Sequence, residues 1–139
     1  MTIHRTQSRR GGATSVEFAM VASVVLLLII GLIVMALGVF RYQELARLAR
    51  DGARYAAVRG ADYARFSGKP AATATDVYQK AILPNAVILT PSKLSADITW
   101  SPDNTAGGQV TVTVRYQWLP ETYFKGMTLS STASMPVIY

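Results

Sequence analysis

A single carboxylate, that of Glu17, stands at the edge of a long apolar run, and its position needs an explanation. The run from Phe18 to Phe40 contains no charged side chain. A carboxylate in a membrane-length apolar segment costs roughly 2.5 kcal/mol or more near the bilayer centre and less near its surface, so such a group usually has a partner. Glu17 therefore either reaches water at a membrane interface or pairs with a cation, and both interpretations are open at this point.

The other residues that could do chemistry do not form a recognisable set. There is no cysteine, which excludes thiol catalysis, cysteine-ligated zinc and disulfides, and the single histidine, His4, lies in a basic N-terminal segment. No glycine-rich phosphate loop follows a predicted strand. The carboxylates beyond residue 60 are scattered without a spacing that pairs them: Asp62, Asp76, Asp97, Asp103 and Glu121. We expect no enzyme activity, no catalytic or cofactor-binding residues, no metal site and no small-molecule substrate.

The net charge of +6 does not indicate nucleic acid as a partner. Of the fourteen Lys and Arg residues, three (Arg5, Arg9 and Arg10) precede Gly12, and the rest are dispersed along the chain. A nucleic-acid-binding domain concentrates its basic residues in a patch or stripe. We therefore expect no nucleic-acid binding.

The apolar run predicts a single membrane-spanning helix over residues 13–40, with the lipid bilayer as a partner. Its 23 uncharged residues would extend about 35 Å as a helix, against a hydrocarbon core of about 30 Å. The residues that follow are too few to surround it as the core helix of a soluble protein. A cleaved signal peptide is shorter and ends in small residues, whereas this run ends in Phe40, Arg41 and Tyr42. Arginines flank the run on both sides, so charge alone does not fix its orientation.

Beyond the run, the sequence has the pattern of an amphipathic helix. Small and apolar residues recur at the spacing that places them on one face. They are Tyr42, Leu45, Ala46, Ala49, Gly52, Ala53, Ala56 and Ala57. Arg47 lies opposite, three residues from Glu44 and four from Asp51, which favours ion pairs along a solvated surface. We predict that residues 41–60 continue the membrane helix and pack closely against another element.

The start of the apolar run resembles the class III signal of type IV pilin-like proteins. There a basic leader ends in glycine, and four residues separate it from Glu-Phe; here Gly12 is followed by ATSV and then by Glu17 and Phe18. The resemblance implies that residues 1–12 are a leader that a prepilin peptidase removes on the cytoplasmic side by cutting between Gly12 and Ala13. It further implies that Glu17 and Phe18 serve recognition and assembly. A carboxylate at Glu17 can neutralise the new amine of Ala13 in the same or a neighbouring subunit, which lowers the desolvation cost of both charges.

Further stretches of the sequence point to one family among the type IV pilin-like proteins. Together with RRGGATSVEFAMV and the Leu/Ile/Val run, the stretch ARLARDGARYAAVRG is similar to the TadE-like family, minor pilins or pseudopilins of the tight-adherence (Flp) pilus system. The similarity extends over residues 9–60 and is weaker from residue 61 onward. It implies a prepilin peptidase, other pilin or pseudopilin subunits and the pilus assembly machinery as partners. It also implies a single-pass protein of the bacterial inner membrane, with a cytoplasmic N-terminus and an extracytoplasmic head.

The segment after the helix contains a linker and a short helix. Residues 61–75 are predicted to be a linker because they contain helix-interrupting glycine and proline. A helix is predicted over residues 77–83, with Thr75 or Asp76 as its N-cap and Pro84 as its stop.

Alternation of apolar and polar residues predicts three strands. Residues 94–100 and 109–118 have the period of two that is typical of half-buried strands, and the loop of residues 101–108 joins them as an antiparallel pair. A third strand is predicted over residues 129–138, where Pro136 favours an edge position.

The expected architecture is therefore α+β, with a long N-terminal transmembrane and amphipathic helix that carries a small antiparallel sheet. The pilin-like head would comprise residues 61–139. We expect Trp100 and Trp118 in the core or at the rim of the sheet rather than stacked on a ligand.

These observations predict a minor pilin, or pseudopilin, that takes part in assembly of a tight-adherence pilus, either inside the fibre or as its primer. The alternative is an unprocessed single-pass, signal-anchored module whose extracytoplasmic head binds a surface, sugar or envelope partner. The major pilin is disfavoured because major subunits of this pilus type resemble little more than the helix, whereas residues 61–139 follow it here.

Overall fold

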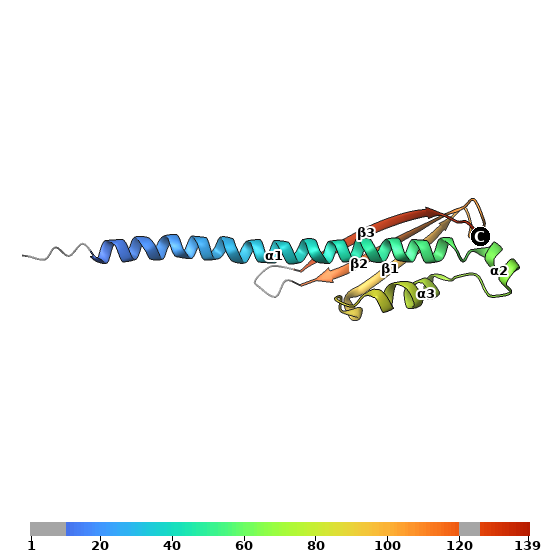
Figure 1. Cartoon of the computed structure of the whole chain (residues 1–139), viewed down its shortest axis with the longest axis horizontal. Helices are drawn as coiled ribbons and strands as arrows, with labels where there is room; N and C mark the ends of the chain where they lie inside the picture. The colour runs from blue at the N-terminus through green and yellow to red at the C-terminus, as the bar shows by residue number, and fades with distance from the viewer. Residues whose placement is uncertain (1–10, 120–125) are drawn as a thin grey trace, which may run out of the picture. The chain divides into compact units, whose positions relative to one another are not determined.

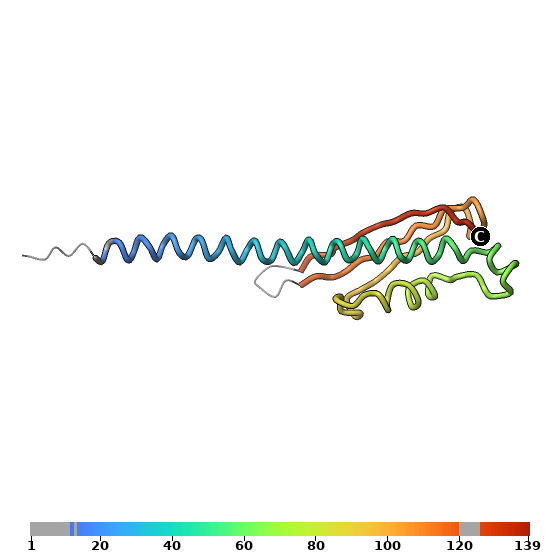
Figure 2. The backbone as a smooth tube through the Cα atoms, in the orientation of Figure 1, coloured from blue at the N-terminus to red at the C-terminus, as the bar shows by residue number. Residues whose placement is uncertain are grey.

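The computed structural model describes residues 11–119 and 126–139 of the chain, and it has the predicted α+β class (Figure 1). Figure 2 follows the same path as a backbone tube. The elements in chain order are the helices α1 (Gly11–Ala57), α2 (Ala61–Ser67) and α3 (Ala74–Val77), the π turn η1 (Tyr78–Ile82), the 3-10 turns η2 (Leu83–Asn85) and η3 (Pro91–Lys93), and the strands β1 (Leu94–Ser101), β2 (Gln109–Trp118) and β3 (Met127–Pro136).

The chain divides into two units within α1, between Leu37 and Gly38. In the first unit, every residue from Thr14 to Leu37 belongs to α1, and none of these residues is buried. The second unit contains the rest of α1 and all the other elements, and it holds the buried core.

In the second unit, α1 packs through the predicted small-residue face, but over a wider arc. Leu45, Ala49, Ala53 and Ala56 of the predicted face have no exposed surface. Leu48, which the predicted face omits, is just as completely buried. Tyr42 was wrongly included among the packing residues, because it is 49% exposed, and Ala46 is half-buried.

The arc is wider because two elements cover this part of the helix. A Cβ added to Gly52 would lie 3.2 Å from Ile82 Cγ1 on η1 and 3.3 Å from Val112 Cγ1 on β2. Figure 1 shows this part of α1 lying across the three strands, with α3 running beside it. A glycine at position 52 thus allows both the sheet and η1 to approach the helix backbone.

The sheet has the order β1-β2-β3, and both pairs of strands are antiparallel. The predicted strands 94–100 and 109–118 are confirmed. The third strand lies two residues earlier than predicted, because its register pairs Met127 with Trp118 and Pro136 with Gln109, the two ends of β2. Pro136 is the last residue of an edge strand, as predicted.

Alternation along β2 places its apolar residues on the face that packs inward. Val110, Val112 and Val114 have no exposed surface, and Tyr116 and Trp118 are also buried. Trp100 on β1 is half-buried. The expected location of both tryptophans in the core or at the rim of the sheet is confirmed.

The predicted linker contains a helix, α2, so that prediction was wrong in part. Gly68 ends this helix as its C-cap in the left-handed conformation, with φ of 68°, and its N–H donates to the Ala64 carbonyl at 3.1 Å. The glycine thus terminates a helix where the sequence suggested only an interruption. Asp62 in the first turn pairs with Arg65 at 3.0 Å and accepts a hydrogen bond from the Ala106 N–H, which joins α2 to the β1–β2 loop.

The next helical segment begins three residues before its predicted start. Its N-cap is Thr73, and neither Thr75 nor Asp76 takes that position. Asp76 does contribute, from the third helical position: the Thr73 hydroxyl accepts from the Asp76 N–H, and the Asp76 carboxylate accepts from the Thr73 N–H. Such a reciprocal capping box satisfies two backbone donors that a helix start leaves unpaired. Pro84 lies inside the turn η2 rather than ending a regular helix.

Candidate functional site

The residues of the predicted processing junction lie at the start of α1. Gly12 and Ala13 lie in α1, which the structure describes from Gly11 onward. Gly12 is exposed, and a Cβ added there would meet no atom within 4 Å. The junction is therefore on the surface of the described structure, where no packing against another element holds Gly12.

Glu17 and Phe18 follow on the same exposed part of the helix. Glu17 is exposed, and Phe18 retains 74% of its accessible surface. Glu17 is four residues after Ala13, the spacing at which two positions lie on one face of a helix, one turn apart. The geometry thus brings the predicted junction and the predicted assembly carboxylate to one side of one helix.

The exposed apolar part of α1 has the length and composition of a membrane span. It contains one window that is long and apolar enough to cross a bilayer, and none of that window is buried by protein. The exposed side chains are large, as Leu27 at 72%, Leu32 at 72% and Ile33 at 53% illustrate. A surface of this kind is stable in lipid and unfavourable in water, because apolar area in water costs about 25 cal/mol per Å².

The ion pairs predicted along α1 are present on its solvated side. Arg47 lies 3.7 Å from a carboxylate oxygen of Glu44 and 3.7 Å from one of Asp51. The Asp51 side chain is 42% exposed, and an exposed pair of this kind contributes about 0.2–1 kcal/mol, whereas the Glu44 side chain is only 12% exposed.

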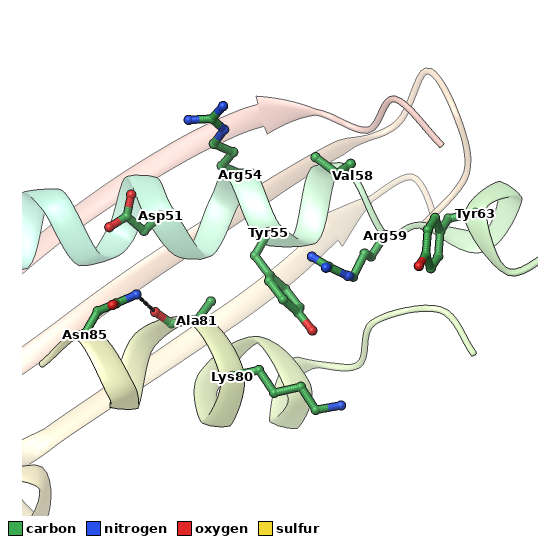
Figure 3. Close-up of a pocket in the computed structure, with 9 residues that line it drawn as sticks. All are labelled: Asp51, Arg54, Tyr55, Val58, Arg59, Tyr63, Lys80, Ala81 and Asn85. Atoms are coloured by element: carbon green, nitrogen blue, oxygen red, sulfur yellow. Dashed lines mark hydrogen bonds between the residues drawn. The ribbon is translucent and has the colours of Figure 1, made fainter. Parts of the chain in front are cut away.

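An open groove of about 370 Å³ lies between the end of α1, α2 and η1 (Figure 3). Its lining residues are Asp51, Arg54, Tyr55, Val58, Arg59, Tyr63, Lys80, Ala81 and Asn85. The Arg59 guanidinium lies over the Tyr55 ring, with its central carbon 4.0 Å from the ring centroid. Tyr55 points from α1 toward η1, and the Asn85 amide donates to the Ala81 carbonyl at 2.8 Å.

Two charged side chains of this groove, Lys80 and Asp51, have ion-pair partners. Lys80 donates to Asp76 at 2.6 Å, and Asp51 pairs with Arg47. Hydrogen bonds from Lys80, and then from Thr73, lower the pKa of Asp76 to about 2, and the same contact with Asp76 raises the pKa of Lys80.

Sequence reasoning did not find the groove. It placed Asp51 on a solvated helix face and left Lys80 and Asn85 without a role. The residues come together only because η1 packs beside the end of α1, and no spacing in the sequence signals that approach. Within residues 11–119 and 126–139, no group of three or more His, Cys, Asp or Glu side chains is arranged to hold a metal ion.

Comparison with known proteins gives one family. The model of the family described as TadE-like protein matches residues 12–54, which begin at the predicted cleavage residue and end within the packed part of α1. No curated protein and no solved structure matches the chain. Residues 12–54 are thus similar to the TadE-like domain, and this match supports a relation to the TadE-like family of the Tad (tight-adherence) pilus system.

Proposed function

We propose that this protein is a minor pilin, or pseudopilin, that takes part in assembly of a tight-adherence pilus after processing by a prepilin peptidase. The observation that supports this most is the extent of the family match. It begins at Gly12, crosses the exposed apolar part of α1 and continues into the part that packs against the head. The similarity thus covers a helix that is half exposed and half packed, as a subunit with a membrane anchor and a folded head requires. The role that we propose is structural, not enzymatic.

Local stability at the junction favours processing between Gly12 and Ala13. A peptidase needs access to the scissile backbone, and here that backbone is helical and Gly12 is exposed. Each glycine is about 1 kcal/mol less favourable in a helix than alanine, so the Gly11-Gly12 pair makes the helix easier to unwind beside the junction. After the cut, Ala13 would carry a new amine, and Glu17 one turn later would pair with it or with that of a neighbouring subunit.

The two parts of α1 would then have separate roles. Its exposed apolar part would hold the subunit in the inner membrane, with the leader in the cytoplasm and the head outside. The same surface would later pack against the helices of other subunits. The groove beside Arg59 and Lys80 would face partner subunits or the assembly machinery, because it offers polar and aromatic groups at the surface of the head.

Mass spectrometry of the full chain, co-expressed with its prepilin peptidase and extracted from membranes, tests the processing. We expect a mature protein that begins at Ala13. Gly12→Leu should block the cut, whereas Gly31→Leu serves as the matched control because a Cβ meets no atom within 4 Å at either glycine. An N-terminus that remains at Met1 or Thr2 in the native sequence would count against the proposal.

The alternative, an unprocessed anchored binding module, draws its support from the groove on the head. Glu17→Ala separates the two functions. It should abolish or strongly reduce pilus formation by a pilin, and it should leave the binding of a head module unchanged. Glu44→Ala removes another carboxylate of α1 that lies in the packed part, so it controls for the loss of charge. Normal piliation with Glu17→Ala would contradict the pilin proposal.

A further inference from the structure

The groove at the end of α1 carries more positive than negative charge. Its charged lining residues are three cations and one carboxylate: Arg54, Arg59, Lys80 and Asp51. Asp51 already pairs with Arg47, whereas neither Arg54 nor Arg59 has an ion-pair partner among the described residues. An anion that enters the groove would therefore meet positive charge that the described part of the chain does not compensate.

Arg59 is the cation with the most defined position in this groove. Its guanidinium lies over the ring of Tyr55, and Figure 3 shows Tyr55 reaching toward Lys80 on η1, whereas Arg54 points the other way. Asp76 raises the pKa of Lys80, and the charge of Arg59 opposes that rise, so the two cations are close enough to repel each other. A guanidinium that stacks on an aromatic ring keeps the donors at its edge available for a carboxylate. A bound carboxylate would relieve the repulsion between Arg59 and Lys80.

A second hollow, of about 310 Å³, adjoins the groove and is apolar. It shares Val58 and Tyr63 with the groove, and Phe66, Ser67 and Tyr139 complete its lining. Phe66 is 84% exposed and Tyr139 is 50% exposed, and no residue of α2, which carries Tyr63 and Phe66, is buried. Adjoining exposed apolar side chains of this kind are typical of a surface that binds another protein.

We infer that the groove and the hollow together bind an acidic segment of a partner protein, which places a carboxylate on Arg59 and a neighbouring apolar side chain beside Phe66. The wall that Val58 and Tyr63 form is common to both spaces, so one short segment can reach both. Arginine, tyrosine and phenylalanine are enriched in protein interfaces, and arginine and tyrosine often dominate the binding energy. A free anion would use the cationic groove alone.

The charge of this segment and the identity of its owner rest on different observations. The acidic character follows from the uncompensated cations of the groove. That the partner is a protein of the pilus rests on the proposed function. The test therefore uses defined peptides, whose binding depends on the groove and not on the pilus.

NMR titration of the isotope-labelled full chain in zwitterionic detergent micelles tests the inference. The probe is the peptide acetyl-Glu-Glu-Phe-Glu-Glu-amide, added up to millimolar concentration. One comparison peptide, acetyl-Gln-Gln-Phe-Gln-Gln-amide, lacks the charge, and the other, acetyl-Glu-Glu-Ala-Glu-Glu-amide, lacks the ring. We expect the probe to shift the backbone amide signals of Arg59, Tyr63 and Phe66 saturably. The peptide without the ring should bind several-fold more weakly, and the peptide without charge should not saturate.

Two pairs of variants assign the binding to the two spaces. Arg59→Gln should weaken binding of the probe about fivefold, because it removes a charge-assisted hydrogen bond. Arg115→Gln, at an exposed position of β2 that lines neither space, should leave it unchanged. Phe66→Ala should weaken binding of the probe about threefold, because the apolar side chain of the peptide loses its contact. Val87→Ala is its matched control, since Val87 is 85% exposed and also lines neither space.

Four outcomes would overturn the inference. The first is the absence of any saturable shift with the probe, and the second is equal binding of the uncharged peptide. The third is an equal loss with Arg59→Gln and Arg115→Gln, which would indicate a general attraction to a basic protein. The fourth is a larger shift of the same amides when phosphatidylglycerol is added to the micelles, which would assign the groove to a lipid headgroup.

The proposed function can fail independently of this inference. Its tests use the N-terminus at Ala13 and the effect of Glu17→Ala on piliation, and neither residue lines the groove or the hollow. Correct processing and a pilus defect with Glu17→Ala, together with no binding of the probe, would overturn the acidic partner alone. Binding of the probe by a chain that keeps its leader would overturn the pilin role and leave the acidic partner in place.

Discussion

The two parts of helix α1 present apolar side chains to different surroundings. Residues 14–37 are rich in Leu, Ile and Val, and the structure leaves none of them buried. In the part from Gly38 to Ala57, the buried side chains are mostly alanines, together with Leu45 and Leu48. One helix thus combines large apolar residues without a protein cover and small apolar residues that a sheet covers closely.

This difference shows that apolar composition does not by itself say what will cover a helix. Small side chains let β2 and η1 reach the helix backbone at Gly52, where close packing replaces water. In residues 14–37, large apolar side chains lie on every face of the helix, so there is no polar face that could remain in water. A helix that is apolar on all sides is typical of a membrane span. Substitutions that treat the two parts alike should therefore have unlike effects.

The largest difference should come from the same substitution in each part. Leu48→Ala removes a fully buried side chain and should lower the free energy of unfolding of the head by about 2–5 kcal/mol. Leu28, 66% exposed in the apolar part, is the matched control, and Leu28→Ala should leave that free energy within about 0.5 kcal/mol. Denaturant unfolding of the full chain in detergent, followed by near-UV circular dichroism, measures both. Equal losses would mean that the head does not depend on the packed part of α1 as described.

An added charge should have its larger effect in the exposed apolar part of α1, and the affected quantity is membrane insertion. Leu28→Arg places a guanidinium near the middle of the apolar run and should disfavour membrane insertion by roughly 2.5–3.5 kcal/mol. Gln43→Arg adds the same side chain to an exposed position beyond the run, so insertion should be unchanged. A glycosylation-based insertion assay measures the inserted fraction of each variant. Equal insertion of both proteins would contradict the assignment of the run to lipid.

Sequence patterns predicted the parts of this fold that depend on local periodicity. The uncharged run, the small-residue stripe and the alternation in residues 94–100 and 109–118 all have a repeat that one window of sequence contains. The exact position of β3 could not be predicted in this way, because its register is set by pairing with the two ends of β2, Gln109 and Trp118. The roles of Gly12 and Glu17 were predicted from a motif and not from a periodic pattern.

Contacts between distant segments were the main omission. Leu48 was left out of the packing face because a single narrow stripe was assumed, whereas two elements cover the helix. The helix α2 was missed because glycine and proline were interpreted as linker signals, and Gly68 in fact caps a helix. The groove beside Arg59 and Lys80 needs three separate segments, so no local pattern could indicate it.

Substitution of a glycine in each part of α1 should also change the stability of the head differently, but by a smaller amount. Gly52→Val adds a branched side chain where even a Cβ meets Ile82 at 3.2 Å and Val112 at 3.3 Å, and overpacking of this kind costs about 1–3 kcal/mol. Gly31→Val introduces the same side chain where a Cβ meets no atom within 4 Å, so it controls for helix propensity. We expect a lower denaturation midpoint for the head with Gly52→Val alone. A midpoint equal to that of Gly31→Val would show that η1 and β2 can retreat from the helix without loss.

The smallest expected effect on stability concerns the N-terminal cap of α3, the helix that leads into η1 beside the packed part of α1. Asp76 caps α3 and pairs with Lys80, and its pKa is lowered from 3.8 to about 2, chiefly by the hydrogen bond from Lys80. A carboxyl whose pKa is lowered on folding stabilises the folded state above its unfolded pKa, and that contribution is lost as the pH falls through the folded value. Asp76→Asn lacks the charge at every pH, so the native protein should be more stable than this variant at neutral pH.

The stability difference between the native protein and Asp76→Asn should therefore close as the pH falls from 3.8 to about 2. Denaturant midpoints of both proteins across this range give the measurement, with Asp97→Asn on the exposed face of β1 as the reference for loss of one carboxylate. Added salt should shrink the difference at neutral pH, because the pair is exposed to solvent. A difference that stays constant down to pH 2 would mean that Asp76 stabilises the start of α3 through the geometry of the capping box and not through its charge.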